Sequence, residues 1–199
     1  MLLFRSFNRF ILIGIALLSL YVPPANAATL NIAGGQLTGA DGVDVNGTLY
    51  NVDFIDGTCV AIFGGCDATS DFTFTTSSDA VAAASALLEQ VFLGGYDEFP
   101  EATAGCTDAI VCRVHTPYDL ISDIVLTLRA DNFSPASGNP DLTAGDGFLS
   151  ASDLSGNTNS VYARWSPAAV NPVPVPAAVW LFSTALIGLV GFCKRRKVA

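Results

Sequence analysis

The stretch Val43-Asp-Val-Asn-Gly-Thr-Leu-Tyr-Asn-Val-Asp-Phe54 predicts a β-hairpin and decides the fold. Its centre is Asn46-Gly47, which favours a type I′ turn because both central residues of that turn need a positive φ. The second arm alternates, so that Tyr50, Val52 and Phe54 share one face. We expect this face to point into the core.

Two more strands are predicted on the C-terminal side of the hairpin. Asp56-Gly57 forms a second turn that leads into a strand over residues 58–63. Residues 71–76 alternate again, with Phe72 and Phe74 directed inward.

The period changes from two to between three and four over residues 78–93, which predicts an amphipathic helix. Ser77 or Ser78 can cap its first turn, and Gly94-Gly95 can end it. The residues expected on its core face are Val81, Ala84, Leu88, Val91 and Phe92.

The later part returns to the strand pattern. A strand is expected within residues 118–129, mostly loop over residues 134–159, and a last strand over residues 160–165. On an ideal strand Tyr162 and Trp165 point to opposite faces, so at least one of them should be exposed. The pattern predicts an α+β fold: an antiparallel, β-rich single domain with one packed helix.

Both ends of the chain carry targeting signals. Residues 1–27 combine a basic start, an apolar run and Ala25-Asn26-Ala27, which is typical of a signal peptide cleaved by signal peptidase. We expect the exported domain to span residues 28–171 and a sorting signal to span residues 172–199.

The C-terminal signal has three parts in order. Its proline motif and the start of its helix read Val173, Pro174, Val175, Pro176, Ala177, Ala178, Val179, Trp180, Leu181 and Phe182. The uncharged run from residue 177 to 193 would form a helix about 25 Å long, at the short end of the lengths that cross a bilayer. A basic stop signal follows at Lys194, Arg195, Arg196 and Lys197, which should remain cytoplasmic.

This tail resembles the PEP-CTERM sorting signal of Gram-negative bacteria, in its variant V-P-x-P-A-A-V-W-L-F. The resemblance implies recognition by a membrane-embedded exosortase, cleavage near the proline motif, and delivery to the cell surface or the extracellular matrix. The membrane would hold only the precursor, through its C-terminal helix. The chain departs from the commonest form of the signal because Val175 replaces the glutamate of Pro-Glu-Pro.

Charge and cysteine content agree with export. The 18 acidic residues all lie in residues 28–171, which hold only three basic residues, for a net charge of −15. Such a domain repels nucleic acid. The four cysteines of this region permit three pairings, and we prefer Cys59–Cys66 with Cys106–Cys112 because each closes a short local loop.

Residues with catalytic potential are few. A nucleophilic triad would have to use His115, and Cys112 beside it is assigned to a disulfide. Glycoside chemistry would need two carboxylates, for which Asp97, Glu98 and Glu101 are candidates among many acids. We expect no enzyme, no cofactor and no metal.

Calcium is the alternative to a purely structural role for two acidic clusters. The first is Asp41, Asp44 and Asn46, whose spacing does not satisfy an EF-hand, and the second is Asp141, Asp146 and Asp153. Turn formation is the simpler interpretation of both.

Two functions remain open. The first is a non-catalytic surface or matrix protein associated with exopolysaccharide. The second is a secreted carbohydrate-binding or glycan-hydrolysing module with the same sorting signal. Binding would need exposed aromatic side chains, and the candidates are Tyr50, Tyr96, Tyr118, Tyr162 and Trp165.

Overall fold

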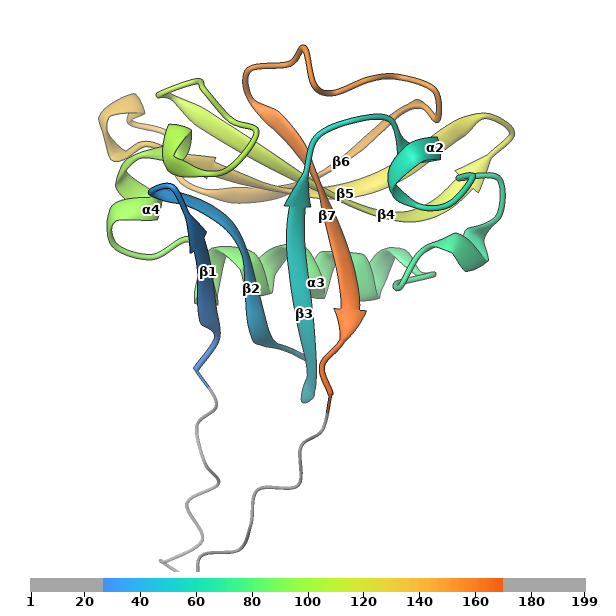
Figure 1. Ribbon diagram of the computed structural model, residues 1–199, viewed down its shortest axis with the longest axis horizontal. Helices are drawn as coiled ribbons and strands as arrows, with labels where there is room; N and C mark the ends of the chain where they lie inside the picture. Colours follow the sequence, from blue (N-terminus) through green and yellow to red (C-terminus); the bar gives the residue numbers. More distant parts are fainter. Residues whose placement is uncertain (1–26, 170–199) are drawn as a thin grey trace, which may run out of the picture. The chain divides into compact units, whose positions relative to one another are not determined.

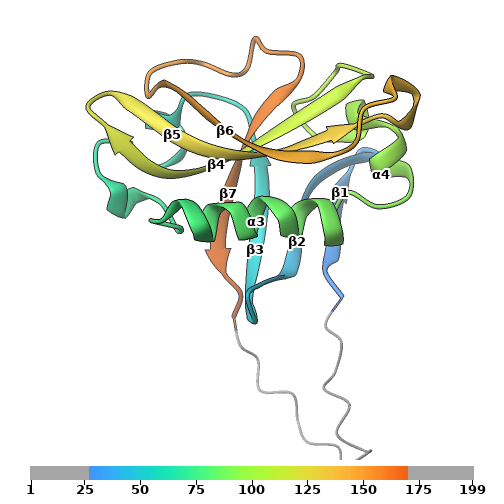
Figure 2. The same ribbon diagram turned by 180° about the vertical axis from the view of Figure 1, so that it is seen from behind.

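The computed structural model describes residues 27–169, which fold into a β-rich α+β domain (Figures 1 and 2). One sheet contains seven strands in the order β1-β2-β3-β7-β4-β5-β6. The strands are β1 (Thr29–Ala33), β2 (Gln36–Val45), β3 (Thr48–Ile55), β4 (Val111–Ile121), β5 (Ile124–Phe133), β6 (Leu142–Leu149) and β7 (Ser160–Pro167). The α-helices are α2 (Cys59–Ile62), α3 (Ser77–Gln90) and α4 (Gly95–Glu98), with 3-10 turns at Thr69–Asp71, Pro100–Ala102 and Pro135–Ser137.

The signal peptide and the C-terminal sorting helix fall outside the described residues. Within residues 27–169, no helix has both the length and the apolar character needed to cross a membrane.

The sheet is antiparallel at every pair of neighbours except one. β4 and β7 run parallel over three residue pairs, from Arg113↔Ser160 to His115↔Tyr162. The prediction of a wholly antiparallel sheet is therefore wrong at this position. The cause is topological, because β7 enters between β3 and β4 and takes its direction from antiparallel pairing with β3.

The central hairpin is formed by β2 and β3, as predicted. Val45 pairs with Thr48, and the turn residues Asn46 and Gly47 have φ values of 54° and 83°. The carboxylate of Asp44 accepts a hydrogen bond of 2.6 Å from the Gly47 N–H, which stabilises the turn. Val52 and Phe54 are buried and Tyr50 is half-buried, so the predicted core face is confirmed.

Gly39 allows β2 and β3 to pair closely at a second point in the hairpin. Its φ is +155°, and a Cβ atom there would overlap the Val52 carbonyl oxygen. The register of the β2–β3 pair shifts just beyond, between Ala40 and Val43. A side chain at position 39 would therefore separate the two strands at a bulge.

Each face of the sheet has its own core. The helix-side core lies between the sheet and α3, and its larger members are Leu37, Val43, Val52, Phe54, Phe74, Leu87, Phe92, Val114, Leu128, Val161 and Trp165. The far-side core, on the opposite face, consists of Cys59, Cys66, Phe72, Val125, Leu154 and Tyr162, with Phe63 and Phe148 packed against it.

Coverage of both faces overturns the expectation that Tyr162 or Trp165 is exposed. The two side chains do point to opposite faces, but Tyr162 is fully buried in the far-side core and Trp165 is 5% exposed in the helix-side core. The indole N–H of Trp165 donates a 3.1 Å hydrogen bond to the Thr116 hydroxyl.

Helix α3 packs on one face of the sheet, as expected (Figure 2). Of the predicted core residues, Ala84, Val91 and Phe92 are buried and Leu88 is half-buried against the core, so the prediction is wrong only for Val81. Its fully buried residues are Ala80, Ala83, Ala84 and Leu87, whereas Val81 is 38% exposed. Alanines on the contact face let a helix approach a sheet closely, so small side chains were favoured over the larger Val81. Thr76, rather than Ser77 or Ser78, caps the first turn by accepting from the Asp79 N–H, and the helix ends at Gln90, before the predicted end.

Two predicted strands are absent from residues 58–63 and 71–76. The first is replaced by α2, whose N-terminus is capped by the Thr58 hydroxyl. The second follows the 3-10 turn at Thr69–Asp71 and forms no paired strand. Phe72 and Phe74 are both buried, but in different cores, because this segment crosses from the far side of the sheet to the side of α3.

The C-terminal half contains more sheet than expected. The predicted strand within residues 118–129 is a hairpin of β4 and β5 that turns at Ser122, which has a φ of 60°. β6 lies inside the predicted loop, and its Gly145 and Gly147 obscured the strand pattern. The predicted last strand is confirmed as β7, two residues longer.

Both disulfides expected from the sequence are present, Cys59–Cys66 and Cys106–Cys112. The first holds α2 against the far-side core, and the second lies in the helix-side core at the start of β4. All four cysteines are at most 2% exposed.

Removing Cys106–Cys112 should lower the free energy of unfolding by about 2 to 3 kcal/mol, from the entropy of closing a short loop. The Cys106→Ala/Cys112→Ala variant can be compared with the parent by urea denaturation of exported protein. Cys59→Ala/Cys66→Ala is the matched comparison and should lose a similar amount, because its loop has nearly the same length. An unchanged midpoint for both variants would contradict the prediction.

Candidate functional site

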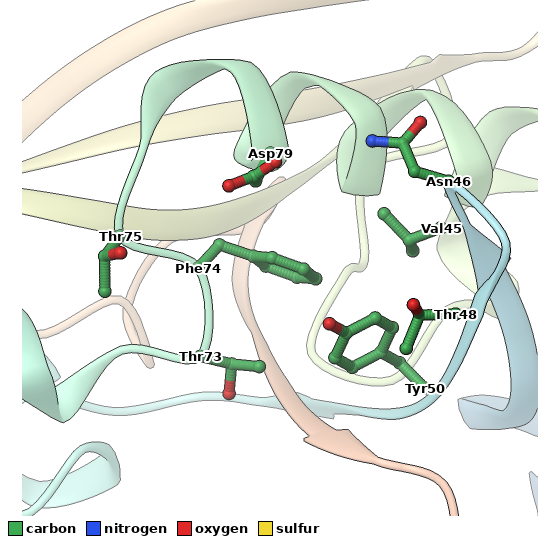
Figure 3. A pocket seen from close by; sticks show the side chains of 8 residues that line it. All are labelled: Val45, Asn46, Thr48, Tyr50, Thr73, Phe74, Thr75 and Asp79. Carbon is green, nitrogen blue, oxygen red and sulfur yellow. The ribbon is translucent and has the colours of Figure 1, made fainter.

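The candidate site is a pocket beside the β2–β3 turn, at the N-terminus of α3 (Figure 3). We call it the hairpin–helix pocket. Its volume is about 220 Å³, and it opens to solvent. It is lined by Val45, Asn46, Thr48, Tyr50, Thr73, Phe74, Thr75 and Asp79.

Three segments bring these residues together. The hairpin contributes Asn46, Thr48 and Tyr50, because the tight turn places the ends of two strands side by side. Residues 73–75 cross below the end of the sheet, and the Thr73 hydroxyl donates to the Trp165 carbonyl over 2.6 Å, which attaches this segment to β7. The first turn of α3 contributes Asp79.

The pocket has an aromatic interior and a polar rim. The rings of Tyr50 and Phe74 lie 5.0 Å apart at an angle of 56°, and the Trp165 ring packs edge-on against both. Figure 3 shows the Asp79 carboxylate and the Asn46 amide above these rings, with the Thr48 hydroxyl on the side of the hairpin. Apolar and polar groups are thus presented to the same small volume.

Several polar groups of the rim keep free hydrogen-bonding capacity. Asp79 accepts from the Thr76 hydroxyl with one carboxylate oxygen, at 2.7 Å. Within residues 27–169, the side chains of Asn46 and Thr48 and the Tyr50 hydroxyl have no hydrogen-bond partner. These groups can therefore bind a polar ligand without breaking a bond of the fold.

The lining of the pocket is acidic. It contains one carboxylate and no basic side chain, in a domain with a net charge of −15. Arg113, Arg129 and Arg164 all lie elsewhere, on strands β4, β5 and β7. The pocket consequently favours neutral or cationic groups over anions.

The arginines form ion pairs on the far side of the sheet. Arg129 bridges Asp131 at 2.7 Å and Asp146 at 2.6 Å, and Arg164 pairs with Asp53 at 3.0 Å. Burial raises the pKa of Asp131, and the attraction of Arg129 only partly opposes this effect. The pairs with Asp146 and Asp53 link neighbouring strands, whereas Asp131 lies on the same strand as Arg129, so these charges have a structural use.

His115 lies inside the sheet rather than in a cleft. It is 3% exposed, its Nδ1 is 3.1 Å from the Thr127 hydroxyl, and its ring packs edge-on against Phe148. Burial lowers the pKa of His115 to about 4, although the carboxylate of Asp146 opposes the shift. Cys112 is held in its disulfide, so the structure does not assemble the nucleophilic pair considered from the sequence.

The carboxylates considered for glycoside chemistry lie at another edge of the domain. Asp97 and Glu98 are on α4, and Glu101 is in the 3-10 turn that follows. Burial, and then the nearby charge of Asp97, raise the pKa of Asp141. Neither these three carboxylates nor Asp141 lines the hairpin–helix pocket.

The candidate calcium ligands are engaged separately. Asp141 accepts from the Phe133 N–H, Asp146 binds Arg129, and Asp153 accepts from Ser155. In the first cluster Asp44 bonds to Gly47, and Asp41 lies further back on β2. Among residues 27–169, no three acidic, histidine or cysteine side chains converge as metal ligands would.

Of the five aromatic residues considered for carbohydrate binding, Tyr50 lines the pocket and the other four lie elsewhere. Tyr162 and Trp165 belong to the two cores, Tyr96 and Tyr118 are half-buried outside the pocket, and Tyr50 lines it. The sequence did not reveal that Asp79 lines the same pocket, because the two residues are 29 positions apart and the segment 73–75 completes the lining between them. The sorting motif and the basic stop signal lie outside the described residues.

No protein-family model matches the chain, and neither the curated proteins nor the solved structures contain a significant match.

Proposed function

We propose that the chain is the precursor of a non-catalytic surface or extracellular-matrix protein that an exosortase system sorts and that associates with exopolysaccharide. The observation that carries this proposal is the order of three parts at the C-terminus: the proline motif from Val173 to Pro176, an uncharged run, and four bases. A simple membrane anchor needs only the last two parts.

The two disulfides support export, because such bonds persist in oxidising compartments. Both link cysteines that are close in sequence, so they can form as the domain folds after translocation. This support concerns the compartment, and it leaves the choice between cell surface and matrix to experiment.

The course of the chain also suits a tethered precursor. The domain begins with β1 and ends with β7, and the start of β1 and the end of β7 lie at the same end of the sheet (Figure 1). The last hydrogen bond of the sheet joins the Ala168 N–H to the Leu49 carbonyl, at 2.9 Å. Only residues 169–172 then separate the folded domain from the proline motif.

The proline motif can be tested directly. We expect Pro174→Ala/Pro176→Ala to leave membrane insertion intact and to block maturation, because the extended segment engaged by the protease is altered. Mass spectrometry of protein from the native host should find full-length chain in the membrane for the variant, and a chain lacking residues 180–197 for the parent.

Pro172→Ala is the matched control, since this proline lies immediately outside the motif. It should mature like the parent. Parent protein that retains residues 180–197, or normal maturation of the double variant, would replace the exosortase proposal with simple tail anchoring.

The second candidate function is a carbohydrate-binding module with the same sorting signal. The hairpin–helix pocket favours it, because Tyr50 and Phe74 lie beneath a rim of hydrogen-bonding groups. Hydrolysis receives less support than binding. It needs a pair of carboxylates, one on each side of the glycosidic bond, and Asp79 is the single carboxylate in the pocket lining.

A further inference from the structure

We propose that the hairpin–helix pocket binds a single uncharged or cationic pyranose residue of a polysaccharide. The inference deepens the proposed association with exopolysaccharide and rests on it for the class of ligand. It assigns a site, formed by Tyr50, Asn46, Thr48 and Asp79, and a charge preference.

The size of the pocket limits what it can hold. Its 220 Å³ lies below the range of about 300 to 1,000 Å³ that encloses a whole drug-sized ligand. One ring-sized group fills such a space, and the remainder of a longer molecule must leave through the open side. A polymer that inserts one residue meets this requirement.

The chemistry of the lining matches the two sides of a pyranose. The C–H groups on one face of the sugar are weakly positive and are attracted to the electron-rich faces of aromatic rings such as Tyr50. Its hydroxyl groups need both donors and acceptors at the edge of the ring. Asn46 supplies both, the hydroxyls of Thr48 and Tyr50 supply both, and Asp79 supplies strong acceptors.

The charge of the lining gives the specificity. A carboxylate beside the sugar hydroxyls stabilises neutral hydroxyl donors and stabilises an ammonium group still more. A uronic acid or sulfated sugar would place an anion against Asp79, with no basic side chain in the pocket lining to compensate. Repulsion therefore excludes anionic residues from this pocket.

The site is supported by parts of the fold that are already ordered. The Asp79 carboxylate accepts a hydrogen bond from the Thr76 hydroxyl at 2.7 Å, and Asp44 accepts one from Gly47 in the hairpin turn. The Thr73 hydroxyl attaches residues 73–75 of the pocket lining to β7. Ligand binding would need little reorganisation, which lowers its entropic cost.

Binding can be measured by isothermal titration of the exported chain with its C-terminal tail uncleaved, produced in a host without an exosortase and kept in a detergent without a sugar headgroup. The probes are a cello-oligosaccharide, a glucosamine oligomer and a polyuronate oligomer. We expect the first two to bind and the polyuronate not to bind. Asp79→Asn should weaken binding of the glucosamine oligomer about tenfold, since it loses a charge-assisted contact. Tyr50→Phe should lower the affinity for both the cello-oligosaccharide and the glucosamine oligomer about threefold or more, because one hydrogen bond is lost.

Matched controls separate a binding role from a structural one. Asp123→Asn removes an acid at the β4–β5 turn, and Tyr118→Phe removes a hydroxyl outside the pocket; neither should change affinity. Asp79→Asn should also narrow the difference in affinity between the cello-oligosaccharide and the polyuronate, which loss of stability alone would not do.

Absence of binding, preference for the polyuronate, or unchanged affinities in both pocket variants would overturn the inference. Processing of the C-terminal tail is measured independently, so failure of the sorting proposal is distinguishable from failure of this site.

Discussion

Trp165→Ala should lower the free energy of unfolding by about 4 kcal/mol, the largest effect that we expect from a single substitution in the domain. Trp165 is 5% exposed and packs edge-on against Phe74 at 5.5 Å and Tyr50 at 6.4 Å. Truncation would leave a cavity beneath the hairpin–helix pocket and remove the hydrogen bond to Thr116. Urea denaturation followed by circular dichroism measures the loss without using tryptophan fluorescence.

Two milder variants divide this effect into its parts. Trp165→Phe keeps most of the apolar volume and should cost about 1 to 2 kcal/mol. Thr116→Val removes only the acceptor of the indole N–H, with an expected cost of about 1 to 2 kcal/mol because the N–H remains buried. If Trp165→Ala were no more destabilising than Trp165→Phe, the packing beneath the pocket would be of little energetic importance.

Lowering the pH from about 7 to about 4.5 should destabilise the domain by about 2 to 3 kcal/mol through His115 alone. Burial lowers the pKa of His115 to about 4 in the folded state, from 6.5 in the unfolded chain. Above the unfolded pKa neither state is protonated, and the stability is complete. As the pH falls towards the folded pKa, the unfolded chain binds a proton that the folded domain does not bind, so the equilibrium shifts towards unfolding.

His115→Gln isolates this contribution. Glutamine can still bond to the Thr127 hydroxyl, and it does not titrate. The variant should lose about 2 to 3 kcal/mol less than the parent over the same pH interval, when both are measured by urea denaturation. Carboxyl groups that do not interact with His115, such as Asp131, titrate in both proteins and cancel in the difference. Equal pH dependence of the two proteins would show that His115 is not held neutral by burial.

The local pattern of the sequence was sufficient where one short segment decides its own structure. Asn46-Gly47 requires positive φ values and formed the predicted turn, and the alternation of Tyr50, Val52 and Phe54 identified the core face of β3. The cysteine pairs were predictable for the same reason, since each closes a short loop. The helix over residues 77–90 followed from its period.

Tertiary packing decided what no single segment could. Val81 has the spacing of a core residue, but close contact with the sheet selected the alanine stripe of α3 and left Val81 exposed. Tyr162 and Trp165 are both buried because the α2 segment covers one face of the sheet and α3 covers the other. The glycines of β6 hid its strand character, which exists only through pairing with β5.

The candidate site also belongs to tertiary structure. Tyr50 stood out as an aromatic residue in the sequence, but its relation to Asp79 depends on the chain crossing at residues 73–75, which was predicted as a strand. The sequence by itself determined the hairpin, the helix, the disulfides and the composition of the C-terminal signal. Only the fold decided which polar groups share a pocket, because residues distant in sequence meet where both faces of one sheet must be covered.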